Sequence, residues 1–183
     1  FSAMASKPRR SHSNHAERFV RFPLQVLRLS GQTDELAVLA PERLLRRMTV
    51  EAGGRISVEG QLRSYNNKSG QGSRLVITTF ARTLCRGGEE DCNEIRLSGV
   101  LCKPPVLRCT PLGREICDLM LAVNRSYGRA DYIPCIAWGG LAEETSLLGV
   151  GDPLSFEGRV QSRLYHKMTP RGQEDRTAYE VSV

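Results

Sequence analysis

The sequence lacks the patterns that most catalytic and metal-binding proteins carry. It has no GxSxG nucleophile elbow, no GxxxxGK[ST] phosphate loop and no CxxC pair, because its six cysteines are spaced 7, 10, 7, 8 and 18 residues apart. Its histidines, His12, His15 and His166, have no glutamate or cysteine at metal-ligand spacing. The sequence therefore predicts neither an enzyme nor a metal site, and it implies no cofactor.

Long hydrophobic runs and aromatic residues are also scarce. No stretch approaches the roughly 20 apolar residues that span a bilayer, which excludes a membrane protein. Aromatic residues make up only 6% of the chain, whereas it holds 17 glycines and 9 prolines, and Val, Ile and Thr recur in short runs. This composition favours many short strands with tight turns. No secretory signal is seen, and Cys117 and Cys135 lie in apolar strand patterns, so we expect reduced, buried thiols in a cytoplasmic protein.

The most informative feature that is present is an internal repeat. A shift of 96 aligns residues 1–8 with 97–104, a shift of 97 aligns 34–44 with 131–141, and a shift of 98 aligns 57–64 with 155–162. The blocks keep their order, so we predict two copies of one fold. The first copy spans 1–86 with a shortened first strand, the second spans 93–183, and a polar linker, 87–92, joins them.

Each copy is predicted to contain three strands, one short helix and a two-stranded hairpin. In the second copy the predicted strands are 93–101, 114–123, 131–138, 153–167 and 176–183, with a helix over 139–148 and a turn over 168–175. In the first copy, helix 41–48 precedes strands 55–65 and 74–81, and SHSNH (11–15) is predicted as a polar turn. This order predicts an all-β protein made of two tandem OB-fold barrels, and a small β-sandwich is the alternative.

Charge is distributed unevenly between the copies. The chain has a formal net charge of +6 and a pI near 9.2. Residues 1–91 hold 15 Lys/Arg and 9 Asp/Glu, which gives +6, whereas residues 92–183 hold 11 of each. A basic excess makes polyanions the first partners to consider.

Candidate binding residues are aromatic rings near strand ends in the second copy. Tyr127, Tyr132, Trp138 and Tyr165 lie near the ends of three predicted strands, and aromatic rings on an OB barrel stack unpaired bases. Trp138 is equally compatible with a place in the core. The cations nearest these rings are Arg125, Arg129, Arg163 and Lys167, which are candidates for phosphate contacts or for a solvated face.

The first copy lacks this set of rings. It has Ser30, Glu35 and Pro41 at the repeat-equivalent positions, which leaves Tyr65 as its candidate stacking ring. Two roles stay open for this copy. It either holds phosphates through Arg63, Lys68 and Arg74, or serves as a structural or dimerising barrel.

The second copy resembles the bacterial single-stranded DNA-binding protein family, through LAVNR (121–125), DYIPCIAWGGLAE (131–143) and EGRVQSRLY (157–165). The resemblance implies that Tyr127, Tyr132, Trp138 and Tyr165 stack nucleotides. It also implies sequence-nonspecific binding and protection of single-stranded DNA in replication, recombination or repair, at the nucleoid. A homodimer presenting four barrels is implied too. No acidic tail is seen in the sequence up to Val183, so recruitment of replication partners through such a tail is not expected. The alternative is a primosome-like assembly or scaffold protein that works mainly through protein–protein contacts.

Overall fold

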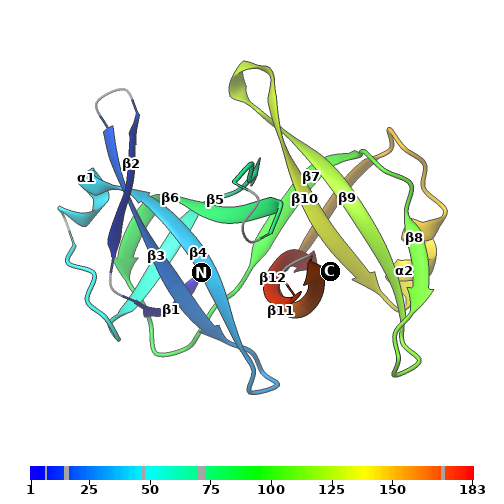
Figure 1. Cartoon of the computed structure of the whole chain (residues 1–183), viewed down its shortest axis with the longest axis horizontal. Helices are drawn as coiled ribbons and strands as arrows, with labels where there is room; N and C mark the ends of the chain where they lie inside the picture. The colour runs from blue at the N-terminus through cyan, green and yellow to red at the C-terminus, as the bar shows by residue number, and fades with distance from the viewer. Residues whose placement is uncertain (7, 15–16, 47, 70–72, 170–171) are drawn as a thin grey trace. The chain divides into compact units, whose positions relative to one another are not determined.

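A computed structural model (Figure 1) describes the chain except residues 7, 15–16, 47, 70–72 and 170–171. Within its strands and helices, the side chains of 10–14, 127, 167 and 169 also lie outside the description. Most of the described residues lie in strands, and the other regular elements are two short α-helices and one 3-10 turn. The predicted all-β class is therefore confirmed. None of the described helices has the length and apolar character that crossing a bilayer requires.

Residues 1–86 form the first sheet and one short helix. The elements are β1 (Ser2–Ala5), β2 (Arg9–Asn14), β3 (Glu17–Leu27), β4 (Thr33–Pro41), α1 (Glu42–Leu45), β5 (Arg55–Asn66) and β6 (Leu75–Arg86). The strand order is β1-β5-β6-β4-β3-β2, and β1 also pairs with β3. This second pairing closes five strands into a barrel and leaves β2 outside it, on the free edge of β3.

The second sheet repeats this arrangement. Its elements are β7 (Ile95–Leu101), β8 (Val106–Cys109), β9 (Glu115–Arg125), the 3-10 turn η1 (Ser126–Gly128), β10 (Arg129–Trp138), α2 (Gly140–Ser146), β11 (Pro153–Thr169) and β12 (Gly172–Ser182). The order is β10-β12-β11-β7-β9-β8, closed by the β10–β9 pairing. The third and fifth barrel strands run parallel in both copies, β4 with β6 and β10 with β12. This is the topology of the OB-fold, as predicted.

A glycine forms the corner of each barrel. β11 pairs with β7 up to Gly158 and with β12 from Arg159 onward. A Cβ atom on Gly158 would lie 2.3 Å from the carbonyl oxygen of Ser182, and one on Gly60 would lie 2.1 Å from that of Phe80. Only glycine allows such a close approach between backbones, so the Glu-Gly dipeptide shared by the two copies marks the point where the strand changes partners.

The core of each barrel is filled by alternate residues of its strands. In β10 the inward residues Ile133, Cys135 and Ala137 are buried, and in β4 the equivalent residues are Leu36, Val38 and Ala40. Period-two alternation places successive side chains on opposite sheet faces. The intervening residues of each strand therefore form the outer face of the barrel, on which the candidate site lies.

Several predicted boundaries were wrong in detail. SHSNH was predicted as a turn, but Ser11–Asn14 belongs to β2, because polar residues suffice for a strand outside the core; His15 lies outside the described residues. The predicted turn 168–175 is mostly strand, since β11 and β12 extend their pairing to Thr169 and Gly172. Both helices are shorter than predicted, and neither has a side-chain N-cap.

The described chain divides into two compact units whose bounds differ from those of the two sequence copies. The first unit is Phe1–Arg63 with Ile77–Asn93, and the second is Ser64–Val76 with Glu94–Val183. The outer part of the β5–β6 hairpin therefore belongs to the second unit. The linker is ordered on the first unit, where Asp91 pairs with Arg55 at 2.6 Å and accepts a hydrogen bond from the Leu27 amide at 2.7 Å.

Candidate nucleic-acid interface

Strand β10 presents the first two candidate rings on the outer face of the second barrel. Its buried residues Ile133, Cys135 and Ala137 point inward, so Tyr132 and Trp138 point outward on the opposite parity. Tyr132 is 48% exposed, and Trp138 is half-buried. Neither ring lies in the barrel interior, although a core position for Trp138 was equally compatible with the sequence.

The register of the sheet extends this face to the third ring. Ile136 of β10 lies opposite Ser182 of β12, and the Trp138 Nε1 atom donates to Ser182 Oγ at 3.0 Å. Ser182 in turn lies opposite Arg159 of β11. Arg163 and Tyr165 follow Arg159 by four and six residues in an unbroken ladder, so their side chains lie on the same face as that of Arg159. Tyr132, Trp138 and Tyr165 therefore share one outer face, across three strands.

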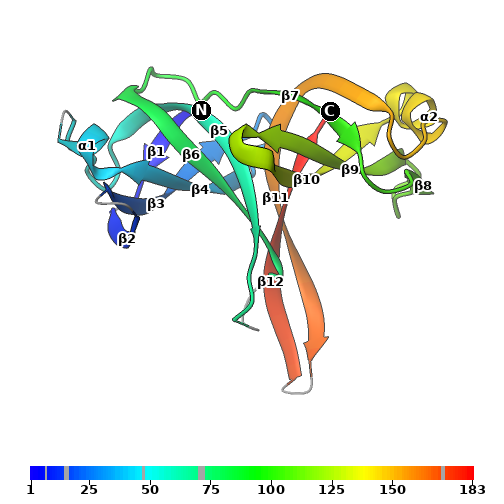
Figure 2. The same ribbon diagram turned by 90° about the horizontal axis from the view of Figure 1, so that it is seen from above.

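The long β11–β12 hairpin extends this face beyond the barrel. Figure 2 shows the hairpin projecting from the second unit, and Tyr165 lies opposite Arg176 within it. Tyr165 is half-buried. Tyr127 lies in η1, between β9 and β10, and its side chain is outside the description, as is that of Lys167.

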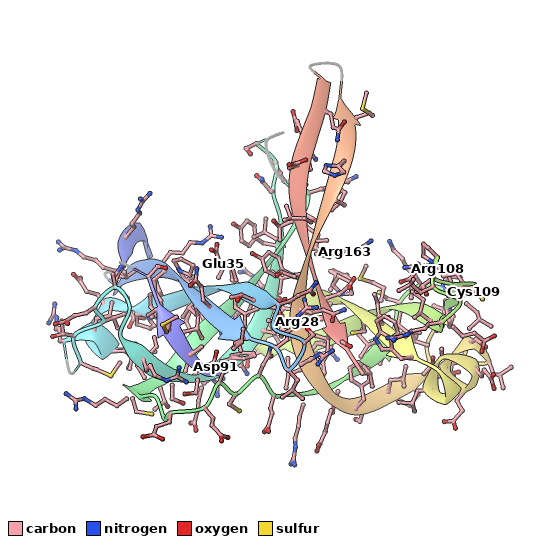
Figure 3. All side chains as sticks on the ribbon, turned by 90° about the horizontal axis from the view of Figure 1, so that it is seen from below. Arg28, Glu35, Asp91, Arg108, Cys109 and Arg163 are labelled. Atoms are coloured by element: carbon pink, nitrogen blue, oxygen red, sulfur yellow. The ribbon has the colours of Figure 1, made fainter. Side chains whose placement is uncertain are left out.

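The predicted cations of the second copy differ in their surroundings. Arg163 stands where the hairpin leaves the barrel (Figure 3), with its side chain 57% exposed and its Nη2 atom 3.9 Å from Glu180. Arg129 is exposed at the start of β10. Arg125 is engaged differently, because its guanidinium donates through two nitrogens to the buried carboxylate of Asp131.

The Arg125–Asp131 pair also holds a segment of the β5–β6 hairpin within the second unit. The Ser64 amide donates to Asp131 Oδ1 at 2.5 Å, and Arg125 donates to the Ser64 carbonyl at 3.2 Å. The Tyr132 amide donates to Ser64 Oγ at 2.7 Å. These bonds fix the backbone that carries the Tyr132 ring. Sequence analysis had no signal for Ser64, because the repeat places this residue in the other copy.

A buried polar pair beneath the face also escaped the sequence analysis. Gln161 donates to Glu180 Oε1 at 2.9 Å. Both residues are buried, although alternation along β11 and β12 places them on the outer face of the barrel. Glu180 is the partner of Arg163, so the buried carboxylate helps to orient that cation on the surface. Their alternation with Val160 and Val181 is the one signal that places them on this face.

Two further titratable groups have shifted pKa values. Arg108 on β8 donates two hydrogen bonds to the Asp118 carboxylate, and this raises the pKa of Arg108 above its ordinary value. Burial, with a smaller contribution from Glu180, raises the pKa of the Cys135 thiol. Among the residues that the structure describes, no group of His, Cys, Asp and Glu is arranged to hold a metal ion.

The candidate residues of the first copy are divided between the two compact units. Arg63 belongs to the first unit and lies over the ring of Phe80, with 3.8 Å from its Cζ atom to the ring centroid. Tyr65, Lys68 and Arg74 belong to the second unit, where all three are exposed. The predicted grouping of these four residues stays a prediction.

The barrel topology makes the chain a tandem OB-fold protein, and comparison with known proteins identifies its family. The model of the single-strand binding protein family matches residues 92–183, just over half of the chain. The chain therefore belongs to the single-strand binding protein family. Family membership also means that it is not an enzyme.

Individual relatives agree with this assignment. The chain is 39% identical over 80 residues to single-stranded DNA-binding protein B of Bacillus subtilis, an alignment that covers 40% of this chain and 71% of the relative. It is 35% identical over 98 residues to the single-stranded DNA-binding protein of Bacillus cereus, covering 50% and 55%. The chain spans about half the length of most of the curated relatives it matches.

One solved structure extends the likeness to both barrels. The wild-type single-stranded DNA-binding protein from Thermus aquaticus superposes with a TM-score of 0.77 at 25% identity. The match covers 100% of this chain and 87% of that one. Since the family model covers only the second barrel, this superposition supports the first barrel as the same fold.

Proposed function

We propose that the chain binds single-stranded DNA without strong sequence preference, by stacking unpaired bases on the outer face of the second barrel. The observation that carries this proposal is the strand register, which aligns Tyr132, Trp138 and Tyr165 on that face. Each stacked base contributes about 1–3 kcal/mol and is accepted whatever its identity, because every base has a π face. Tyr127 is the fourth proposed ring.

The phosphates of the bound strand are held by cations around the rings. Arg129 and Arg163 are exposed on the second unit, and Lys167 follows Arg163 along β11. Phosphate contacts release condensed counterions, so binding weakens as salt rises. We assign Arg125 to positioning, because its guanidinium already bonds to Asp131 and to the Ser64 carbonyl. In the β5–β6 hairpin, Tyr65, Lys68 and Arg74 are exposed and extend the set of proposed contacts.

The proposed biological role is protection of single strands during replication, recombination or repair, in the cytoplasm at the nucleoid. The names of the relatives support the ligand, since those proteins are single-stranded DNA-binding proteins. We further propose a homodimer that presents four barrels. Light scattering with and without oligonucleotide tests this arrangement, since a monomer in both states would contradict it.

Fluorescence titration tests the proposed stacking. Trp138 is the single tryptophan of the chain, so its emission reports on this face alone. We expect oligo-dT to quench the emission, with an affinity that falls steeply as salt is raised. A duplex of equal length should bind much more weakly, because its bases are already stacked on one another. Duplex binding as tight as single-strand binding, without quenching, would overturn the proposal.

A further inference from the structure

The outer face of the first barrel carries a row of side chains that runs across four strands. Phe80 of β6 lies opposite Leu39 of β4, Leu39 lies opposite Arg21 of β3, and Arg21 lies opposite Arg9 of β2. Residues opposite one another in a ladder share a sheet face. Leu39 lies between the buried residues Val38 and Ala40, so the row points away from the core.

The equivalent row of the second barrel has different chemistry. There Ser182, Ile136, Asp118 and Val106 lie opposite one another in the same order of strands. Phe80 thus replaces a serine, Arg21 replaces an aspartate and Arg9 replaces a valine. Asp118 is bonded by Arg108, and the second-barrel row is therefore nearly neutral. The first-barrel row combines a ring with two cations.

A third arginine, Arg63, lies over the Phe80 ring at one end of this row. The Arg63 guanidinium carbon stands 3.8 Å from the centroid of the Phe80 ring, and Phe19 packs against Phe80 with a centroid distance of 5.9 Å. Phe80 and Arg63 are half-buried, whereas Phe19 is buried. A guanidinium over a ring contributes a cation–π interaction, and guanidinium planes and aromatic rings both stack bases.

The two outer arginines of the row are available to a ligand. Arg9 and Arg21 are exposed, and no described residue forms an ion pair with either of them. The acid on the same outer face of β4 is Glu35, four residues before Leu39 (Figure 3). Two adjacent, like-charged side chains repel each other unless an anion lies between them.

We propose that this row, Phe80–Leu39–Arg21–Arg9 with Arg63 on Phe80, is a second binding surface for a single-stranded nucleic acid. Arg9 and Arg21 would hold two phosphates, and the Arg63–Phe80 stack would hold a base. This inference rests on the proposed function, since it assigns the same ligand to the first barrel. It replaces the missing aromatic positions of that barrel with a platform on other strands.

The test is a double variant, Arg9→Gln with Arg21→Gln, measured with oligo-dT of increasing length at several salt concentrations. Log affinity falls with log salt, and each lost phosphate contact makes this slope shallower by about 0.7. The slope of the double variant should therefore be shallower by about 1.4. The strand length occluded per chain should also shorten. Affinity for the shortest oligonucleotides that quench Trp138 should stay unchanged, because the second barrel is intact.

The matched control is Arg46→Gln with Arg86→Gln, which removes the same charge from exposed residues of the first unit outside the row. It should leave the occluded length unchanged. Phe80→Leu, which keeps an apolar side chain, should weaken binding of long oligonucleotides about fivefold or more through lost stacking. A row variant with the slope and occluded length of its control would overturn the inference. Failure of the wild-type chain to bind any single strand would instead overturn the proposed function.

Discussion

The two barrels share their framework and differ on their outer faces. Each has a bidentate ion pair between residues six apart in sequence, Arg28 with Asp34 and Arg125 with Asp131, in which the aspartate is buried. Each turns its fourth strand at a glycine. On the outer face, by contrast, Tyr132 of β10 corresponds to Glu35 of β4, and Asp118 of β9 corresponds to Arg21 of β3. The framework positions are alike in both barrels, whereas the outer positions differ in charge and in aromatic content.

The largest expected effect is a loss of stability when the ion pair shared by both barrels is removed. Asp34→Ala or Asp131→Ala removes a buried carboxylate and leaves the paired arginine without its acceptor. We expect the unfolding free energy to fall by about 2–3 kcal/mol. Urea denaturation followed by circular dichroism measures this loss. Glu35→Ala, on an exposed residue beside Asp34, is the control and should change stability by less than about 0.5 kcal/mol. Equal stability of Asp34→Ala and Glu35→Ala would contradict the assigned role of the ion pair.

The next largest effect is expected when Tyr132 of the second barrel is replaced by glutamate, the residue at the equivalent position, Glu35, of the first barrel. Tyr132→Glu removes a stacking ring and adds a charge that repels phosphates, so affinity for oligo-dT should fall about 5- to 150-fold. Tyr132→Phe keeps the ring and should bind nearly as the wild type does. Equilibrium titration of both variants at one salt concentration distinguishes them, and similar losses in the two would argue against stacking.

The reverse exchange gives the first barrel the ring of the second. Glu35→Tyr removes a negative charge from the face that carries Arg21 and supplies a ring at the position of Tyr132. Affinity for long oligonucleotides should rise about fivefold, the lower end of the stacking range. Glu35→Gln separates the two contributions, because it removes the charge alone. A Glu35→Tyr variant no tighter than Glu35→Gln would show that a ring at this position meets no base.

A smaller difference between the barrels lies in the core, where Cys135 occupies the position of Val38. Burial raises the pKa of the Cys135 thiol, so the folded state keeps its proton when the unfolded chain loses one. Stability is therefore unaffected below the ordinary thiol pKa of about 8.5 and declines by up to about 1.4 kcal/mol per pH unit above it. Cys135→Val should reduce the alkaline loss of stability, measured as unfolding free energy against pH. A pH profile parallel to the wild type would contradict this assignment.

Sequence alone predicted the repeated architecture because period-two alternation and the repeat offsets depend on local spacing. The helix position between the third and fourth barrel strands and the core alternation around Ile133 follow from such spacing, whereas spacing left Trp138 equally compatible with the core and with the outer face. The strands β2 and β8 were missed, since Arg9–Asn14 is polar and Val106–Cys109 is short and exposed. β8 has no buried residue, and Arg9–Asn14 has no alternating apolar residues, so neither segment carries the sequence pattern of a half-buried strand.

The parts of the site that sequence missed depend on pairing between distant strands. Phe80 and Arg21 come together through β4, and Ser64 meets Asp131 across 67 residues of sequence. Arg125 was predicted to contact phosphate, and its bidentate bond to Asp131 was not foreseen, because the two residues lie on different strands. Such contacts depend on which residues of two paired strands lie opposite each other, and comparison of the two sequence copies does not predict this.

Base stacking on the second barrel can be tested by photocrosslinking the chain to a single strand that carries 5-bromodeoxyuridine, followed by peptide mapping. We predict crosslinks in β10 at Tyr132 or Trp138 and in β11 at Tyr165, the rings of the outer face. Crosslinks confined to α2, with none in β10 or β11, would contradict stacking on this face.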